Sequence, residues 1–190
     1  VLEYYDPKSA TWHPKTKNQR NYYYFQDTIF LRDSETMQWN SYHNKWISIY
    51  SKHYDQNGNS TEEISYDWGP TKAYPETGIK TVYSYIEDGN LTVKENHRWD
   101  RKQKNWYKID RVNTKNDHEL NRLIEETEIW NESKGKWITS RRSTTQSNEL
   151  GSVILQENVI FGNGGNEVVL VNTVQNEYDD QGNLKETYRL

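Results

Sequence analysis

The sequence repeats with a period of 31 residues, and this period limits the possible folds more than any other feature. Aromatic side chains recur at this interval, at Trp68, Trp99, Trp130 and Phe161. A second series with the same interval consists of Gly58, Gly89, Leu120, Gly151 and Gly182. Repeats of this length are single supersecondary units that bury their apolar side chains against neighbouring copies. The sequence therefore predicts one repeat domain over residues 1–190.

The repeat divides the domain into units of two strands each. The expected units run over about 29–57, 58–88, 89–119, 120–150 and 151–181, after an eroded N-terminal unit at 1–28. One turn of a unit is a polar segment such as Tyr54–Asn59 or Tyr178–Asn183, with a shorter version at Glu87–Asn90. Asp-Gly and Asn-Gly in these segments supply the positive φ that tight hairpin turns require.

The other turn of each unit lies between two aromatic residues seven positions apart. The three tryptophan pairs with this spacing are Trp39 and Trp46, Trp99 and Trp106, and Trp130 and Trp137. Two turns per period leave about ten residues for each strand, enough for roughly 33 Å. The predicted fold class is all-β, an up-and-down antiparallel meander of long hairpins. Low apolar content favours an open or partly wrapped sheet over a closed barrel.

The tryptophan spacing also predicts which residues face each other. If Trp130 lies opposite Trp137, then Glu126 lies opposite Arg141 and Glu125 opposite Arg142, which are favourable cross-strand pairs. The face that carries the tryptophans then also carries a column of carboxylates, Glu95, Glu126 and Glu157.

One segment, residues 116–130, has two competing interpretations. Its polar start, Asn116 to Glu119, followed by apolar residues at helical spacing, is typical of a capped amphipathic helix. The 31-residue repeat instead places a turn and then a strand here. We favour the turn and strand, because tertiary context overrides weak helix propensity.

Composition supports strands and excludes several classes of function. The chain has 8 Trp, 15 Tyr and 3 Phe, so rings replace aliphatic side chains in what is expected to be a thin core. Its formal net charge is −4 and basic residues do not cluster, so a nucleic-acid partner is not expected. No apolar run approaches the roughly 20 residues of a spanning helix, so the protein is not expected to span a membrane. The chain has no cysteine, which excludes disulfides and thiol nucleophiles.

The turns and tryptophan pairs together resemble a known kind of protein. Tyr-Asp-x-x-Gly-Asn, at Tyr54–Asn59 and Tyr178–Asn183, combined with Trp-x6-Trp hairpins, resembles exported hairpin-repeat domains of unknown function from gut Bacteroidetes. The turn is more distantly similar to the YD repeats of bacterial surface and shell proteins. The resemblance implies a β-hairpin repeat fold and export to the periplasm or cell surface, with a signal segment ahead of Val1. It implies no catalytic residues.

No motif indicates a cofactor or a metal. His118 and Glu119 begin a zinc motif, but Arg122 stands where the second histidine is needed. We therefore expect neither a metal nor a cofactor. The column Glu95, Glu126 and Glu157 is the one constellation with catalytic potential, because glycosidases use two carboxyl groups. Repeats produce such columns automatically, so structural ion pairs are the favoured interpretation.

Two functions follow as hypotheses. The favoured one is a non-catalytic, exported binding or structural module that contacts a glycan or an extended protein partner. The competing one is a hydrolase that acts on polysaccharides through the glutamate column. The candidate binding residues in the first case are Trp99, Trp106, Trp130, Trp137, Glu95 and Glu126.

Overall fold

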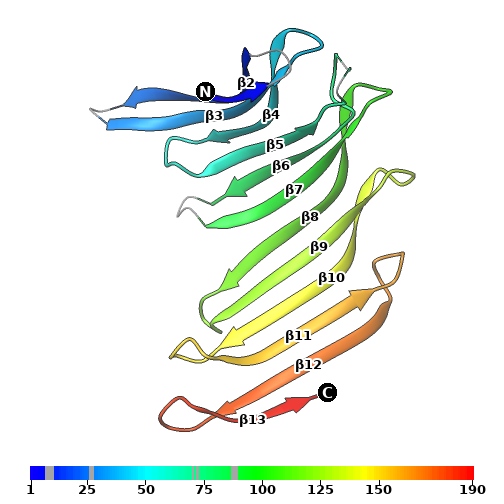
Figure 1. Ribbon diagram of the computed structural model, residues 1–190. Helices are drawn as coiled ribbons and strands as arrows, with labels where there is room; N and C mark the ends of the chain where they lie inside the picture. The colour runs from blue at the N-terminus through cyan, green and yellow to red at the C-terminus, as the bar shows by residue number, and fades with distance from the viewer. Residues whose placement is uncertain (7–10, 26–27, 70, 72, 87–89) are drawn as a thin grey trace. The chain divides into compact units, whose positions relative to one another are not determined.

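The chain forms one antiparallel sheet in which thirteen strands follow each other in sequence order (Figure 1). The computed structural model describes residues 1–6, 11–25, 28–69, 71, 73–86 and 90–190. The strands are β1 (Leu2–Asp6), β2 (Thr11–Phe25), β3 (Thr28–Asn40), β4 (Lys45–Tyr54), β5 (Ser60–Asp67), β6 (Thr77–Tyr85), β7 (Leu91–Asp100), β8 (Asn105–Asp117), β9 (Arg122–Asn131), β10 (Lys136–Ser147), β11 (Val153–Phe161), β12 (Val168–Tyr178) and β13 (Leu184–Arg189). None of the described residues is helical, and the sheet is not closed. The predicted all-β meander is confirmed.

Two compact units make up the chain, and each is described by itself. Unit 1 comprises residues 1–90 and 96–108, and unit 2 comprises residues 91–95 and 109–190. Strands β7 and β8 contribute residues to both.

The segment 116–130 is a turn followed by a strand, as the repeat predicts. β8 ends at Asp117 and β9 begins at Arg122. The Asp117 carboxylate accepts a hydrogen bond of 3.2 Å from the Leu120 N–H, and Asn121 has a φ of 47°. The polar residues that resemble a helix cap therefore close a hairpin turn instead.

Three turns at multiples of the 31-residue period share one hydrogen-bond pattern. In each, the side-chain oxygen of Asp55, Asn148 or Asp179 accepts from the backbone N–H groups two and four residues further on, at 2.8–3.0 Å. A glycine three residues after this acceptor has φ of 82° or 83°, at Gly58, Gly151 and Gly182. The Gly151 turn lacks Tyr-Asp, yet it keeps the geometry because Asn148 provides the same acceptor. The turn predicted at Glu87–Asn90 lies largely outside the described residues.

The turns between paired tryptophans also share one design. The residue after the first tryptophan caps each turn with its side-chain oxygen: Asn40 accepts from the His43 N–H, Asp100 from Lys102 and Gln103, and Asn131 from Lys134. The residue five positions after that tryptophan is left-handed in every case, with φ of 50° at Asn44, 53° at Lys104 and 59° at Gly135.

Pairing around the third tryptophan pair corrects the predicted register. Trp130 lies opposite Trp137 and Ile129 opposite Ile138, as expected. A β-bulge at Ser140 then shifts the register by one residue, so Arg142 pairs with Glu126 and Arg141 with Thr127. The predicted pairs Glu126–Arg141 and Glu125–Arg142 are therefore wrong. The Ser140 hydroxyl donates a 3.0 Å hydrogen bond to the Thr127 carbonyl oxygen, which fixes the extra residue.

The sheet has little enclosed core. Among the described residues, Ile47 and Val159 are the buried hydrophobic side chains, and no side chain is completely buried. The accessible surface is 13311 Å², whereas a compact monomer of 22.8 kDa exposes about 9,600 Å². Because the strands form a single layer, both faces of the sheet keep contact with solvent and are available for binding.

Candidate functional site

Paired tryptophans form the ends of the hairpins. The rings of each pair meet edge to face, with centroid distances of 5.5 Å for Trp39 and Trp46, 5.3 Å for Trp99 and Trp106, and 5.2 Å for Trp130 and Trp137. Edge-to-face pairs of this kind contribute about 0.5–1.5 kcal/mol beyond the area that they bury. All six rings are half-buried. Trp99 and Trp106 belong to unit 1, and Trp130 and Trp137 belong to unit 2.

Charged side chains of unit 2 hold one of these pairs in place. The Arg111 guanidinium lies 4.8 Å from the centroid of Trp137. The Arg111 Nε donates a 2.6 Å hydrogen bond to Glu128, whose side chain is 15% exposed. Asn113 donates to the same carboxylate oxygen. This cluster ties β8, β9 and β10 together beside the tryptophan pair and so stabilises this face of the sheet.

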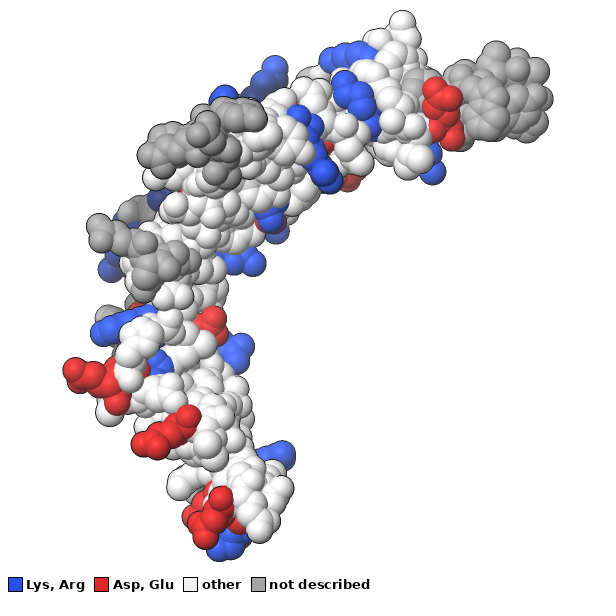
Figure 2. Space-filling model, turned by 90° about the vertical axis from the view of Figure 1, so that its left-hand side faces the viewer, with Lys and Arg blue, Asp and Glu red and all other residues white. Residues whose placement is uncertain are grey.

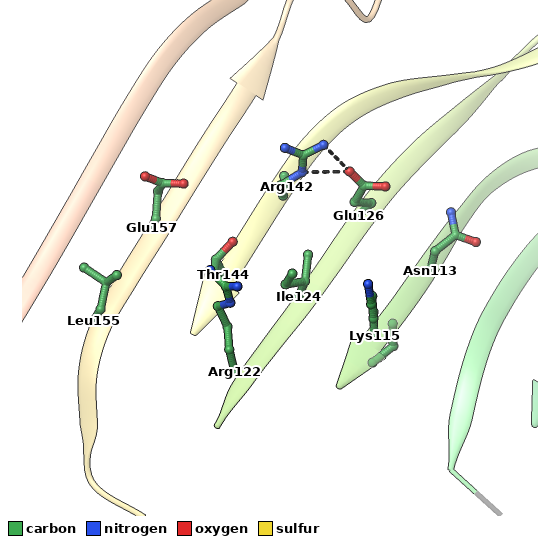
Figure 3. Close-up of a pocket in the computed structure, with 10 residues that line it drawn as sticks. Asn113, Lys115, Arg122, Ile124, Glu126, Arg142, Thr144, Leu155 and Glu157 are labelled. Carbon is green, nitrogen blue, oxygen red and sulfur yellow. Dashed lines mark hydrogen bonds and ion pairs between the residues drawn. The ribbon is translucent and has the colours of Figure 1, made fainter. Parts of the chain in front are cut away.

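An open groove crosses strands β8 to β11 on the tryptophan-bearing face of unit 2 (Figure 3). Its volume is about 500 Å³. The groove is lined by Asn113, Thr114, Lys115, Arg122, Ile124, Glu126, Arg142, Thr144, Leu155 and Glu157. The four strands span roughly 14 Å between the outermost two, so the groove fits an elongated ligand better than a compact one.

Glu126 occupies the middle of the groove and is held by Arg142. The Arg142 Nε donates to Glu126 Oε1 at 2.7 Å, and its Nη2 lies 2.5 Å from the same oxygen (Figure 3). Arg142 also lies 5.7 Å from the centroid of Phe161. The predicted site residue Glu126 is thus part of a structural ion pair. Glu95 is half-buried in β7, and the groove does not include it.

Two charged side chains of the groove form no ion pair or hydrogen bond within the described chain. Lys115 on β8 is exposed and Glu157 on β11 is half-buried, and neither side chain makes an ion pair or hydrogen bond with another described residue. Arg122, by contrast, donates to Asp117 at 3.2 Å. The Leu120 N–H and this guanidinium hold the pKa of Asp117 below its usual value. A ligand in the groove would therefore meet a free donor on one side and a free acceptor on the other.

Sequence reasoning identifies Glu126 and Glu157 but misses the cations of the groove. Strict alternation from Trp137 puts Arg141 on the tryptophan face, whereas the bulge at Ser140 brings Arg142 there instead. Arg141 pairs with Ile160 on the other face and donates to Asn158 at 2.7 Å. The 31-residue repeat alone gives no signal for a bulge.

The surface carries charges of both signs. Figure 2 shows basic and acidic side chains scattered among uncharged ones over the surface in view. Within the described residues, no group of three or more His, Cys, Asp or Glu side chains is arranged to hold a metal ion. The described chain also contains no helix that is long and apolar enough to cross a membrane.

Comparison with known proteins gives distant structural likenesses and no function. No family model matches the chain, and no curated protein matches it. A protein of unknown function from Bacteroides fragilis has 14% identity and a TM-score of 0.45, with 91% of each chain covered. A DUF3836 family protein from Bacteroides vulgatus has 20% identity and a TM-score of 0.41, with 48% of this chain and 88% of that chain covered. A porin-like protein from Bacteroides uniformis has 10% identity and a TM-score of 0.30, with 98% of this chain and 85% of that chain covered. The chain is thus distantly similar to Bacteroides proteins of unknown function.

Proposed function

We propose that this protein is a non-catalytic module that binds an extended glycan in the groove of unit 2. The observation that carries the proposal is the groove itself, which is open and crosses four strands. It has aliphatic side chains, Ile124 and Leu155, beside unpaired hydrogen-bonding groups. Glycans have apolar C–H faces and many hydroxyl groups that both donate and accept, so they match such a lining.

The free groups of the groove favour a polyhydroxylated ligand over a strongly charged one. Lys115 provides a donor and Glu157 an acceptor, and the Glu126–Arg142 pair between them presents both kinds of group. A polyanion would meet Glu126 and Glu157, and a polycation would meet Lys115, Arg122 and Arg142. Hydroxyl groups can bond with either sign.

Hydrolysis of the glycan is the competing function, because Glu126 and Glu157 line the same groove. A glycosidase needs two carboxyl groups with different roles, one of them a proton donor. Glu126 is already engaged by two nitrogens of Arg142, which supports a structural role. We further propose that the module works outside the cytoplasm, in the periplasm or at the cell surface, as the turn resemblance implies.

The test combines binding and turnover on one panel of plant, host and bacterial polysaccharides. We expect binding by isothermal titration, with no release of reducing sugar. Arg142→Gln should weaken binding by about tenfold, since it removes charged hydrogen bonds at the centre of the groove. Arg141→Gln is the matched control on the other face and should leave affinity unchanged.

Two results would contradict the proposal. Equal effects of the two arginine substitutions would exclude the groove as the binding site. Release of reducing sugar that disappears in Glu126→Gln would establish the hydrolase.

A further inference from the structure

Unit 1 contains a separate cleft in which three aromatic side chains lie beside polar and aliphatic ones. It lies where the β3–β4 hairpin turns, beside the end of β5, and includes Trp39, Asn40, Tyr66, Asp67 and Trp68. We call these five residues the aromatic cleft. The volume is about 360 Å³. Small-molecule sites occupy about 300–1,000 Å³, so the cleft has the size of a binding site for one small group.

The rings of the aromatic cleft are held by contacts with each other and with residues outside it. Trp39 packs edge to face on Trp46. Tyr66 lies between Trp68 and Trp106, with centroid distances of 6.4 and 5.8 Å. The Trp68 Nε1 donates a 2.6 Å hydrogen bond to the Ser48 carbonyl oxygen. A ligand that stacks on these rings therefore loses little side-chain entropy on binding.

Two polar groups of the aromatic cleft are available to a ligand. Asn40 is 7% exposed, and its Oδ1 accepts a 3.0 Å hydrogen bond from the His43 N–H. Its Nδ2 has no acceptor among the described residues. Asp67 is exposed, and its carboxylate has no described partner. The cleft therefore presents one donor and one acceptor to a ligand.

We propose that the aromatic cleft binds a neutral hexopyranose ring of a glycan. The apolar C–H face of the sugar would lie against the rings, one hydroxyl would accept from Asn40 Nδ2, and another would donate to Asp67. Asp67 is the one charged residue among the described residues of the lining, so it disfavours an anionic sugar. The inference goes beyond the proposed function, because the cleft belongs to unit 1 and shares no residue with the groove.

Unit 2 contains an equivalent cleft at its Trp130–Trp137 hairpin, which provides a matched control. Trp130, Asn131 and Phe161 take the places of Trp39, Asn40 and Trp68. The volume is about 250 Å³. Ile129 stands where unit 1 has Gln38, and none of the residues given for this lining is charged, so the cleft lacks the acceptor that Asp67 provides in unit 1.

The decisive variant is Asn40→Asp in the full chain. It keeps the Oδ1 acceptor for the His43 N–H, as Asp100 does at the equivalent turn of the β7–β8 hairpin, and it removes the free N–H donor. Asn131→Asp is the control. The probes are neutral hexasaccharides of glucose, mannose and galactose, and binding is followed by saturation-transfer NMR and tryptophan fluorescence. Asn40→Asp should weaken binding of the probe by about tenfold, whereas Asn131→Asp should not change it.

Asp67→Asn is the second variant, and it keeps the test valid if Asn40→Asp unfolds the turn. It should also weaken binding, because an amide accepts a sugar hydroxyl less strongly than a carboxylate. Failure of every neutral hexasaccharide to bind at millimolar concentration would overturn the inference. Equal effects of Asn40→Asp and Asn131→Asp would also overturn it. The residues that line the groove include no tryptophan, so the fluorescence change reports on the cleft, and a failure of the groove proposal is recognised separately.

Discussion

The two equivalent clefts share a scaffold and differ in their lining. In both, a tryptophan pair meets edge to face, at 5.5 Å in unit 1 and 5.2 Å in unit 2, and an Asn after the first tryptophan caps the turn. The unit 1 cleft adds Trp68 and a buried Asn40, whereas the unit 2 cleft has Phe161 and a half-buried Asn131. The repeat therefore preserves what forms the hairpin, while the residues available for binding vary between copies.

The unit 2 cleft is smaller, and a loop lies against it. Gly165 has a φ of 77°, and a Cβ built there would lie 2.8 Å from Ile138 Cγ2 and 3.3 Å from the Thr139 backbone. Ile138 and Thr139 line this cleft. The backbone of the loop between β11 and β12 thus lies so close to the cleft that only glycine fits at position 165.

The largest expected effects come from removing a ring of the shared scaffold. Trp39→Ala and Trp130→Ala should each lower the free energy of unfolding by about 3 kcal/mol, at the lower end for aromatic truncations because the rings are half-buried. Urea denaturation measures both. If either variant had the same free energy of unfolding as the wild type, the two tryptophan pairs would not stabilise their hairpins equally.

The next largest effect separates two costs of replacing a glycine, a steric clash of the added methyl group and the strain of a positive φ. Gly165→Ala should destabilise the protein by about 2 kcal/mol, because the added methyl group clashes with Ile138 at a positive φ. Gly151→Ala, with a φ of 82° and open space around it, should cost about 1 kcal/mol for the backbone alone. Equal unfolding free energies for the two variants would contradict the close packing of the loop in unit 2.

A stabilising substitution tests whether the tryptophan turns are equivalent. Lys104 in unit 1 has the left-handed conformation that Gly135 has in unit 2. Lys104→Gly should raise the unfolding free energy by about 0.5–1 kcal/mol, since the strain on a side chain at this φ exceeds the entropy lost by glycine. Asn44→Gly is the control with almost no expected gain, because Asn tolerates this conformation. A loss of stability in Lys104→Gly would refute the equivalence.

The smallest effect concerns the pH dependence of the turn aspartates. Partial burial acts to raise the pKa of Asp55, but hydrogen bonds from Asn59, Asn57 and Gly58 outweigh it and lower the pKa below 3.8. A depressed pKa stabilises the fold above the ordinary pKa, and this contribution disappears as the pH falls through the lower, folded value. Asp55→Asn should therefore cost about 0.5 kcal/mol or less at neutral pH and nothing in strong acid.

Urea denaturation at both pH values measures this difference, and Asn148 shows that an amide can form the same turn. A cost of Asp55→Asn that stays constant with pH would contradict the assigned cause. Asp179, whose pKa is lowered by the N–H groups of Asn183, Gln181 and Gly182, should behave in the same direction in unit 2.

Most of the fold follows from the sequence because the turns have local causes. In the turn at residues 55–58, Asp55 provides the hydrogen-bond acceptor and Gly58 adopts the positive φ, so the residues of the turn are enough to predict it. The same period places β9 at Arg122–Asn131 despite a helix-like start.

The candidate sites were less predictable, because they depend on long-range geometry. Two of the bulges fall three residues after the second tryptophan of a pair, at Ile49 in β4 and Ser140 in β10, and these residues have no chemistry in common. Each bulge decides which following residues share the tryptophan face, as it does for Arg142. The burial of Asn40 depends on how neighbouring strands pack around it, and the sequence of the turn does not show this.

The central claim is that the protein binds an extended glycan. The most direct test measures the affinity of the wild-type protein for glycans of increasing length. Equivalent side chains recur on every second strand, about 9.6 Å apart, so a longer bound glycan makes further contacts. With one neutral glycan, cut into oligosaccharides from two sugars to ten, titration calorimetry should show Kd falling steeply as the chain lengthens, until the glycan spans the four strands of the groove. A Kd that is independent of length beyond the disaccharide, or absence of binding at every length, would contradict the account.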